Sequence, residues 1–166
     1  MPKLDPTKAP VRTGSIYPEP YASQMAGRSS VRLGDLAGLT QFGVNIVTLQ
    51  PGAVASLRHW HLREDEFALV LEGSLTLVED TGETPMLPGD CAAWKAGVAD
   101  GHRFVNRSDK PGKFLIVGTK SPEEVATYSD VDLQIHIAGG KARFTYQDGS
   151  DWAGHRDLAP KGETNG

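Results

Sequence analysis

Short runs in which apolar and polar side chains alternate fill the middle of this chain. The first spans residues 41–49 and ends at Pro51-Gly52, and the later runs cover residues 56–61, 66–78, 92–96, 102–106 and 114–118. Alternation places successive side chains on opposite faces of a strand. Turn residues such as Glu72-Gly73 separate the runs, and short strands about 8–12 residues apart are typical of a sandwich or barrel. The sequence therefore predicts an all-β fold.

The sequence after the central runs predicts a helical connector and a hairpin. Ser121-Pro122-Glu123-Glu124 has the order of an N-cap, a proline at the first helical position and an acidic first turn, which predicts about one turn of helix. Alternating residues 131–137 and 142–146, joined by Gly139-Gly140, predict a hairpin outside the barrel. From about Ser150 the chain carries little apolar surface, so we expect a flexible tail.

The amino-terminal segment has a different composition. It holds five prolines in its first 24 residues, namely Pro2, Pro6, Pro10, Pro18 and Pro20. Proline interrupts helices and central strands, so this segment is expected to be an arm that lies on a surface. The predicted organisation is an arm (1–30), one barrel (31–120), a connector with the hairpin (121–149) and a tail (150–166).

Composition narrows the possible functions. The 166 residues fit one domain, and 19 glycines with 11 prolines suit many turns. A net charge of −4 offers no basic surface for nucleic acid, and no apolar run approaches the ~18–20 residues of a membrane span. The polar start of the chain lacks the apolar centre of a secretory signal, so we expect a cytoplasmic protein. The single cysteine, Cys91, cannot form an internal disulfide.

Three histidines and one glutamate are the candidate metal ligands. His59 and His61 stand two residues apart on a predicted strand, so their rings share a face. Glu66 opens the next strand, and His102 begins a later one. Three neutral imidazoles and a carboxylate suit one divalent transition metal, Zn, Fe, Mn, Ni, Co or Cu, and are too rich in nitrogen for Mg or Ca.

The spacing of these residues resembles the first motif of the cupin superfamily, usually written G(x)5HxH(x)3–4E(x)6G. The matching residues are Gly52, His59, His61, Glu66 and Gly73. One extra residue separates Gly52 from His59.

The second cupin motif, G(x)5PxG(x)2H(x)3N, is also matched. The matching residues are Gly89, Gly97, His102 and Asn106. Lys95 replaces the motif's proline, and four residues instead of two precede His102. The resemblance, over about residues 41–118, is to small single-domain bacterial cupins of the conserved-barrel cupin 2 type. It implies a double-stranded β-helix, or jelly-roll barrel, with one metal ion held by the four candidate ligands.

A divalent ion with this ligand set carries a formal charge of about +1, which favours an anionic oxygen ligand. Three functions stay open: Lewis-acid chemistry on a small anionic or polyhydroxy metabolite, as in the isomerases, epimerases and lyases of this superfamily; an Fe(II) dioxygenase; and a non-catalytic ligand-binding or sensor module. The sequence offers no acid–base pair beyond the ligands, so enzymatic activity itself stays open. Trp94, Phe104 and Asn106 are the candidate substrate contacts, the last two because they share a strand face with His102.

Two predicted strands, residues 41–49 and 66–78, are apolar on both faces, although a barrel wall needs only its inner face apolar. One of the sets Phe67/Leu69/Leu71 and Ala68/Val70 must therefore point outward and needs a cover. We expect a homodimer that buries more than roughly 1,500 Å² in total. The arm or the hairpin could supply part of the cover, within one chain or by exchange between two.

Overall fold

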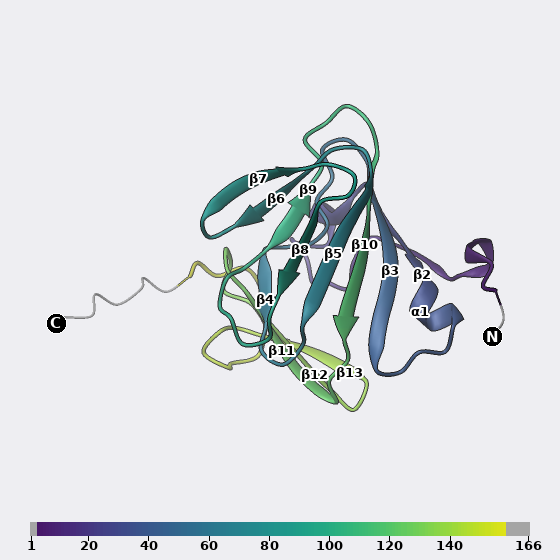
Figure 1. Ribbon diagram of the computed structural model, residues 1–166. Coiled ribbons are helices and arrows are strands. Elements are labelled where there is room, and N and C mark those ends of the chain that lie inside the picture. The colour runs from purple at the N-terminus through teal and green to yellow at the C-terminus, as the bar shows by residue number, and fades with distance from the viewer. Residues whose placement is uncertain (1–2, 159–166) are drawn as a thin grey trace.

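The computed structural model describes residues 3–158, and its regular secondary structure is almost entirely antiparallel β-strand (Figure 1). The largest sheet has six strands in the order β1 (Val11–Thr13), β2 (Arg28–Arg32), β3 (Phe42–Leu49), β10 (Gly112–Thr119), β5 (Glu66–Glu72) and β8 (Cys91–Trp94). Its centre is β10, which pairs with β3 on one side and with β5 on the other. The prediction of an all-β fold is confirmed.

Two smaller sheets complete the molecule. One contains β13 (Lys141–Thr145), β12 (Gln134–Ala138), β11 (Glu123–Tyr128) and β4 (His59–His61), and the other contains β7 (Gly82–Met86), β6 (Leu75–Glu79) and β9 (Arg103–Val105). Helical structure in residues 3–158 is limited to the 3-10 turns Pro6–Lys8 and Ser23–Met25 and to α1 (Leu33–Leu36). None of these helices has the length and apolar character needed to cross a membrane.

The main core lies inside the barrel, between the six-stranded sheet and the three-stranded sheet. Its buried side chains include Val47, Leu49, Ala68, Val70, Leu75, Leu77, Phe104 and Phe114. Burying one such large apolar side chain contributes about 1.5–3 kcal/mol. On β5, Ala68 and Val70 point inward, so Phe67 and Leu71 point outward and remain 41% and 42% exposed.

A second core joins the amino-terminal arm to the carboxy-terminal sheet. Its buried members are Tyr21, Met25, Leu57, Ala126, Tyr128, Leu133 and Ile135. The Tyr17 ring meets Tyr128 edge-on, with 5.4 Å between ring centroids, and also contacts Phe144 of β13. The arm and the hairpin therefore pack against each other in one chain, which leaves the outward side chains of β5 exposed.

The predicted helical connector is wrong, because residues 123–128 form strand β11. This strand pairs with β12 on one side and with β4 on the other, so its backbone groups are bonded on both edges. Glu124, Ala126 and Tyr128 are buried on one face, which is the period of two expected for a strand. Pairing with the two neighbouring strands outweighs the local sequence signal for the start of a helix. As a result, β12 and β13 extend the sheet that carries His59 and His61.

Two further segments differ from their predictions. Residues 82–86, which lie outside the predicted alternating runs, form β7 and pair with β6. Part of the expected tail packs on the arm: Trp152 lies 5.7 Å from Tyr21, centroid to centroid, and the Tyr21 hydroxyl is 2.8 Å from Nδ1 of His155. Apolar surface from an aromatic ring is what orders this segment. Residues 159–166 of the predicted tail lie outside the described residues.

Candidate metal centre

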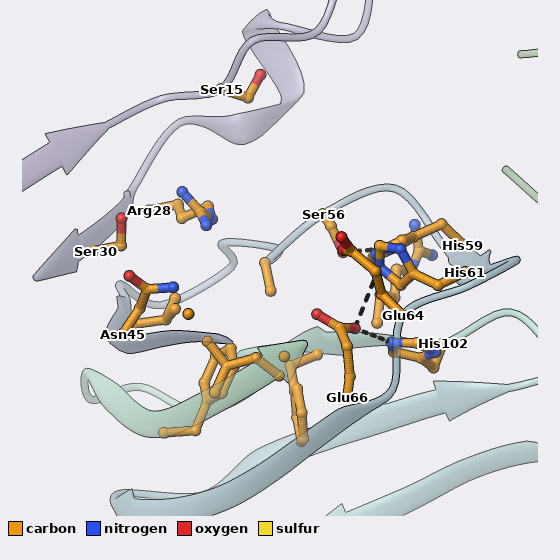
Figure 2. Close-up of a pocket in the computed structure, with 18 of the residues that line it drawn as sticks. Ser15, Arg28, Ser30, Asn45, Ser56, His59, His61, Glu64, Glu66 and His102 are labelled. Atoms are coloured by element: carbon orange, nitrogen blue, oxygen red, sulfur yellow. Dashed lines mark hydrogen bonds and ion pairs between the residues drawn. The ribbon is translucent and has the colours of Figure 1, made fainter. Parts of the chain in front are cut away.

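Strand pairing brings the histidines of the two sequence motifs together. His59 and His102 exchange backbone hydrogen bonds, with N···O distances of 3.2 and 2.9 Å. Their ring centroids are 5.0 Å apart, and the His59 and His61 centroids are also 5.0 Å apart. Because His59 and His61 are two residues apart on β4, both rings face the cavity (Figure 2).

Glu66 supplies the carboxylate of the cluster from the first position of β5. Its Oε2 atom lies 2.9 Å from Nε2 of His102 and 3.5 Å from Nε2 of His61 (Figure 2). Donor atoms of His59, His61 and Glu66 all lie within 4.8 Å of one another. The structure thus brings all four predicted ligand side chains to one end of one cavity.

His59 is held in a form suited to binding a metal. Its Nδ1–H donates to the carbonyl of Leu57 at 2.9 Å, which leaves the lone pair on Nε2 free. Burial, aided by the neighbouring His61, lowers the pKa of His59 to about 3. The ring is therefore neutral at physiological pH, as a metal ligand must be.

The other donors also fit a metal ion. Burial opposes the ionisation of Glu66, but the hydrogen bond from Nε2 of His102, together with the His61 ring 3.5 Å away, holds the pKa of this carboxyl well below its usual value. Both ring nitrogens of His61 and Nδ1 of His102 are buried without a hydrogen-bond partner. Buried nitrogens without a hydrogen-bond partner destabilise the folded protein, and a divalent ion would bind the nitrogen lone pair of the neutral His61 ring.

Glu124 of β11 lies behind His61 and was not foreseen in the sequence. Only 1% of it is exposed, and its carboxylate accepts hydrogen bonds from the backbone N–H groups of Leu62, Arg63 and Val125 at 2.8–2.9 Å. Its Oε1 atom lies 3.9 Å from Nδ1 of His61. A carboxylate behind a ligating imidazole orients the ring and raises its basicity.

Trp94, a predicted substrate contact, packs on the cluster. Its ring stacks on His102 with centroids 3.8 Å apart and planes 8° apart, and its Nε1–H donates to Glu79 at 2.8 Å. These contacts fix the plane of the His102 ring. Phe104, another predicted contact, lies against Trp94 and also lines the cavity.

Asn106, the third predicted contact, lies away from the cavity. Its Nδ2 donates to the carbonyls of Leu49 and Lys110, both at 2.8 Å, and its Oδ1 accepts from the backbone N–H and the hydroxyl of Ser108. All its hydrogen-bonding capacity is used. Asn106 therefore holds the loop before β10 and has no polar atom to offer a ligand.

The cavity has a volume of about 390 Å³, within the range of small-molecule sites. Val47, Phe114 and Ile116 are among its apolar walls, and Glu64 adds a carboxylate outside the four candidate ligands. A bound divalent ion would face this space and could take an oxygen ligand from it.

Comparisons with known proteins agree with this architecture. The profile of the cupin domain family matches residues 45–118, and no curated protein matches the chain significantly. The structure is similar to that of a protein from Silicibacter pomeroyi described as a sugar phosphate isomerase from a cupin superfamily. The two are 54% identical, the match covers 92% of this chain and 97% of the other, and the TM-score is 0.89.

Two more distant structures show the same fold. One, from Acidithiobacillus ferrooxidans, carries a provisional description as a sugar phosphate isomerase; it is 25% identical, over 78% of this chain and 81% of its own, with a TM-score of 0.69. The other is a polyketide cyclase from Streptomyces resistomycificus, 25% identical over 72% and 79% of the two chains, with a TM-score of 0.56. The jelly-roll fold and both motifs agree with these matches, and the chain belongs to the cupin superfamily.

Proposed function

We propose that this protein binds one divalent transition-metal ion through His59, His61, Glu66 and His102 and uses it as a Lewis acid on a small, anionic polyhydroxy metabolite. An isomerisation of the sugar phosphate type is the reaction that the similarity favours, since a 54% identical cupin carries that description. The observation that carries the proposal is that four donor side chains, His102 buried and the other three partly buried, line one cavity, and that two of them have unpartnered ring nitrogens.

When bound, the ion would polarise a carbonyl or hydroxyl oxygen of the substrate and make the neighbouring C–H more acidic. The chain's own residues would set the charge of the site and transfer the proton. With His59 neutral and Glu66 ionised, the divalent ion and its four ligands together would carry a net charge of about +1, which attracts an anionic oxygen. Glu64 is the cavity carboxylate outside that set, so it is placed to take a proton from one carbon and return it to the next.

The test begins with untagged protein purified without a nickel column. We expect about one equivalent of a divalent transition metal by elemental analysis. Incubation of the loaded protein with sugar phosphates in D₂O should then exchange deuterium into the carbon next to the carbonyl, as followed by NMR. His61→Ala should lose both metal and exchange, whereas His155→Ala, outside the cavity, should keep both.

Each contrary outcome has a distinct meaning. Protein that holds no divalent metal, even after loading, contradicts the proposed ligand set. Stoichiometric metal without deuterium exchange on any sugar phosphate contradicts the isomerase chemistry. Iron as the native metal, with oxygen consumption and no exchange, would replace the isomerase with the dioxygenase.

We also propose that the active form is a homodimer built on the outer face of the six-stranded sheet. The outer patch is defined by side chains that alternate with the core positions of β3, β5 and β10: Val44, Ile46, Phe67, Leu69, Leu71, Leu115 and Val117. Leu115 stands between Ile46 and Leu69, and Val117 between Val44 and Phe67, so the patch is continuous.

A second copy of the chain is the occupant that suits the outer patch. The arm and the hairpin, the other candidate covers, are used in the second core. Glu72 and Lys113, paired at 2.6 Å at the patch edge, offer both signs of charge to an identical surface. Self-pairing about a two-fold axis would bury roughly 1,500 Å² in total, the size of a stable interface.

A further inference from the structure

The end of the cavity away from the histidines is built by a different part of the chain. Arg28 and Ser30 lie on the inward face of β2, which precedes the region matched by the cupin domain family, and Asn45 comes from the paired strand β3. Ser15 of the arm completes this wall. Figure 2 shows Arg28, Ser30 and Asn45 on the opposite side of the view from the metal-ligand cluster, with Ser15 above them.

Arg28 is a partly buried cation with little to neutralise it. Its Nη1 donates to the carbonyl of Gly14 at 3.2 Å, while its Nε is buried without a hydrogen-bond partner. Among residues 3–158, no carboxylate lies within ion-pair distance of it. Burial lowers the pKa of Arg28, and nearby Arg12 and Arg32 act in the same direction.

A buried donor of a charged group that lacks a hydrogen bond destabilises the folded state, and buried charges are normally paired. An arginine fork that keeps donors free inside a cavity is suited to an anion with two acceptor oxygens, either a phosphate or a carboxylate.

Three other cations add to the positive potential at the Arg28 end of the cavity. Arg12, Arg32 and Lys120 all line the cavity. Asp35 pairs with Arg32 and lies 3.9 Å from Lys120, which neutralises part of that charge.

At the metal-binding end, by contrast, the cavity is lined by the carboxylates of Glu64 and Glu66 and by the three histidines of the candidate metal site. Arg103 also lines the cavity. The cavity is therefore polarised, with a basic end and a metal-binding end.

We propose that Arg28, assisted by Ser30 and Asn45, forms a subsite for an anionic group at the far end of the ligand. The inference rests on the proposed function, because the metal ion would hold the opposite end. It narrows the substrate class to small molecules with two heads: oxygens that can chelate a metal at one end and a phosphate or carboxylate at the other. The preference for the ligand's terminal group would then come from Arg28 and Ser30 of β2, a strand that lies outside both histidine motifs.

The test compares ligands that differ only in their terminal group. Erythronate, tartrate and 4-phosphoerythronate share four carbons and end in a hydroxyl, a carboxylate and a phosphate, respectively; glycerate, tartronate and 3-phosphoglycerate form the three-carbon set. Calorimetric titration of each into Mn²⁺-loaded protein should show tighter binding of an anionic terminus, by about 10- to 100-fold over the hydroxyl in at least one set. The terminus that binds more tightly shows whether the subsite accepts a phosphate or a carboxylate.

Variants then assign the preference to Arg28. Arg28→Gln should reduce the preference for the anionic terminus to less than about threefold and leave both Mn²⁺ binding and the affinity for the hydroxyl-ended ligand unchanged. Arg28→Lys keeps the charge without the fork and should retain an intermediate preference, which also tests the idea if the glutamine variant folds poorly. Lys113→Gln removes a cation from the outer surface and should change nothing.

Two results would overturn the subsite. One is a wild-type protein that binds Mn²⁺ but shows no preference for an anionic terminus in either set. The other is a folded Arg28→Gln variant that keeps the full preference. Failure of the proposed function looks different: Mn²⁺ would not bind, while titration of inorganic phosphate into the metal-free protein would still be weakened by Arg28→Gln.

Discussion

Replacing Glu124 with glutamine removes the charge behind His61 and preserves the size of the side chain. In the native structure Oε1 accepts from the N–H groups of Leu62 and Val125, and Oε2 accepts from the N–H of Arg63. A glutamine can present only one oxygen. In its better orientation the amide oxygen keeps the first two bonds, and its NH₂ group then faces the N–H of Arg63, donor against donor.

The expected cost follows from these contacts. Loss of one hydrogen bond to a charged acceptor costs about 1.5–3 kcal/mol, and the two bonds that remain become weaker because their acceptor is neutral. Relief from burying a charge offsets part of this. We expect the free energy of unfolding to fall by about 2–4 kcal/mol, which for a chain of this size lowers Tm by about 5–15 °C.

The same substitution should weaken the metal site. Glu124 lies 3.9 Å from Nδ1 of His61, and the loss of such a partner typically lowers metal affinity by about 10- to 100-fold. Urea unfolding of the metal-free protein and competitive chelator titration of the loaded protein measure the two effects separately. Glu123→Gln changes the exposed neighbour and is the matched control. Stability and affinity both equal to those of the control variant would refute the role given to Glu124.

Three other substitutions test the site, the assembly and the fold. His61→Ala should reduce bound metal from about one equivalent to none and leave the far-UV circular dichroism intact, since the core does not include the ion; complete unfolding would instead show a structural metal. Phe67→Glu in the outer patch should convert a dimer to a monomer by light scattering at micromolar concentration, and a wild-type monomer under the same conditions would remove the dimer proposal. Gly73→Ala should lower the free energy of unfolding by about 2–4 kcal/mol, because φ is +77° and a Cβ would lie 2.6 Å from the carbonyl oxygen of Pro111. Gly82→Ala, where φ is +126° and a Cβ meets nothing within 4 Å, should cost less in the same urea titration.

The predicted ligands could be located from the sequence because their geometry is local. Two histidines at i and i+2 share a face in any strand, and Glu66 opens the strand that follows. The same period of two separates the inward Ala68 and Val70 from the outward Phe67, and the structure selects between the two sets that the sequence left open. His102 needed the motif as well, since no local rule brings a residue 41 positions away to β4.

The segment around Glu124 could not be assigned in this way. Locally, Ser121 and Pro122 satisfy the rules for a helix start, and six residues are too few for periodicity to oppose them. The strand exists because β4 and β12 each offer it an edge, and both edges are distant in sequence. The sequence also did not reveal the role of the Asn106 side chain: its Nδ2 donates to the carbonyl of Leu49, which is distant in sequence, and to that of Lys110, four residues away.

The two ends of the cavity are built by different segments of the chain, so each end can change in sequence without the other. The candidate metal ligands come from β4, β5 and the residue that precedes β9, all within residues 45–118, the region that the cupin family profile matches. Arg28 and Ser30 come from β2 and Ser15 from the arm, which precede that region. In the proposed arrangement the four donors bind the ion and the opposite wall contacts the rest of the ligand, so a change in the arm is expected to alter the substrate without disturbing the metal. A barrel with the same histidines but no cation at the position of Arg28 should therefore bind the same metal and favour a different terminal group.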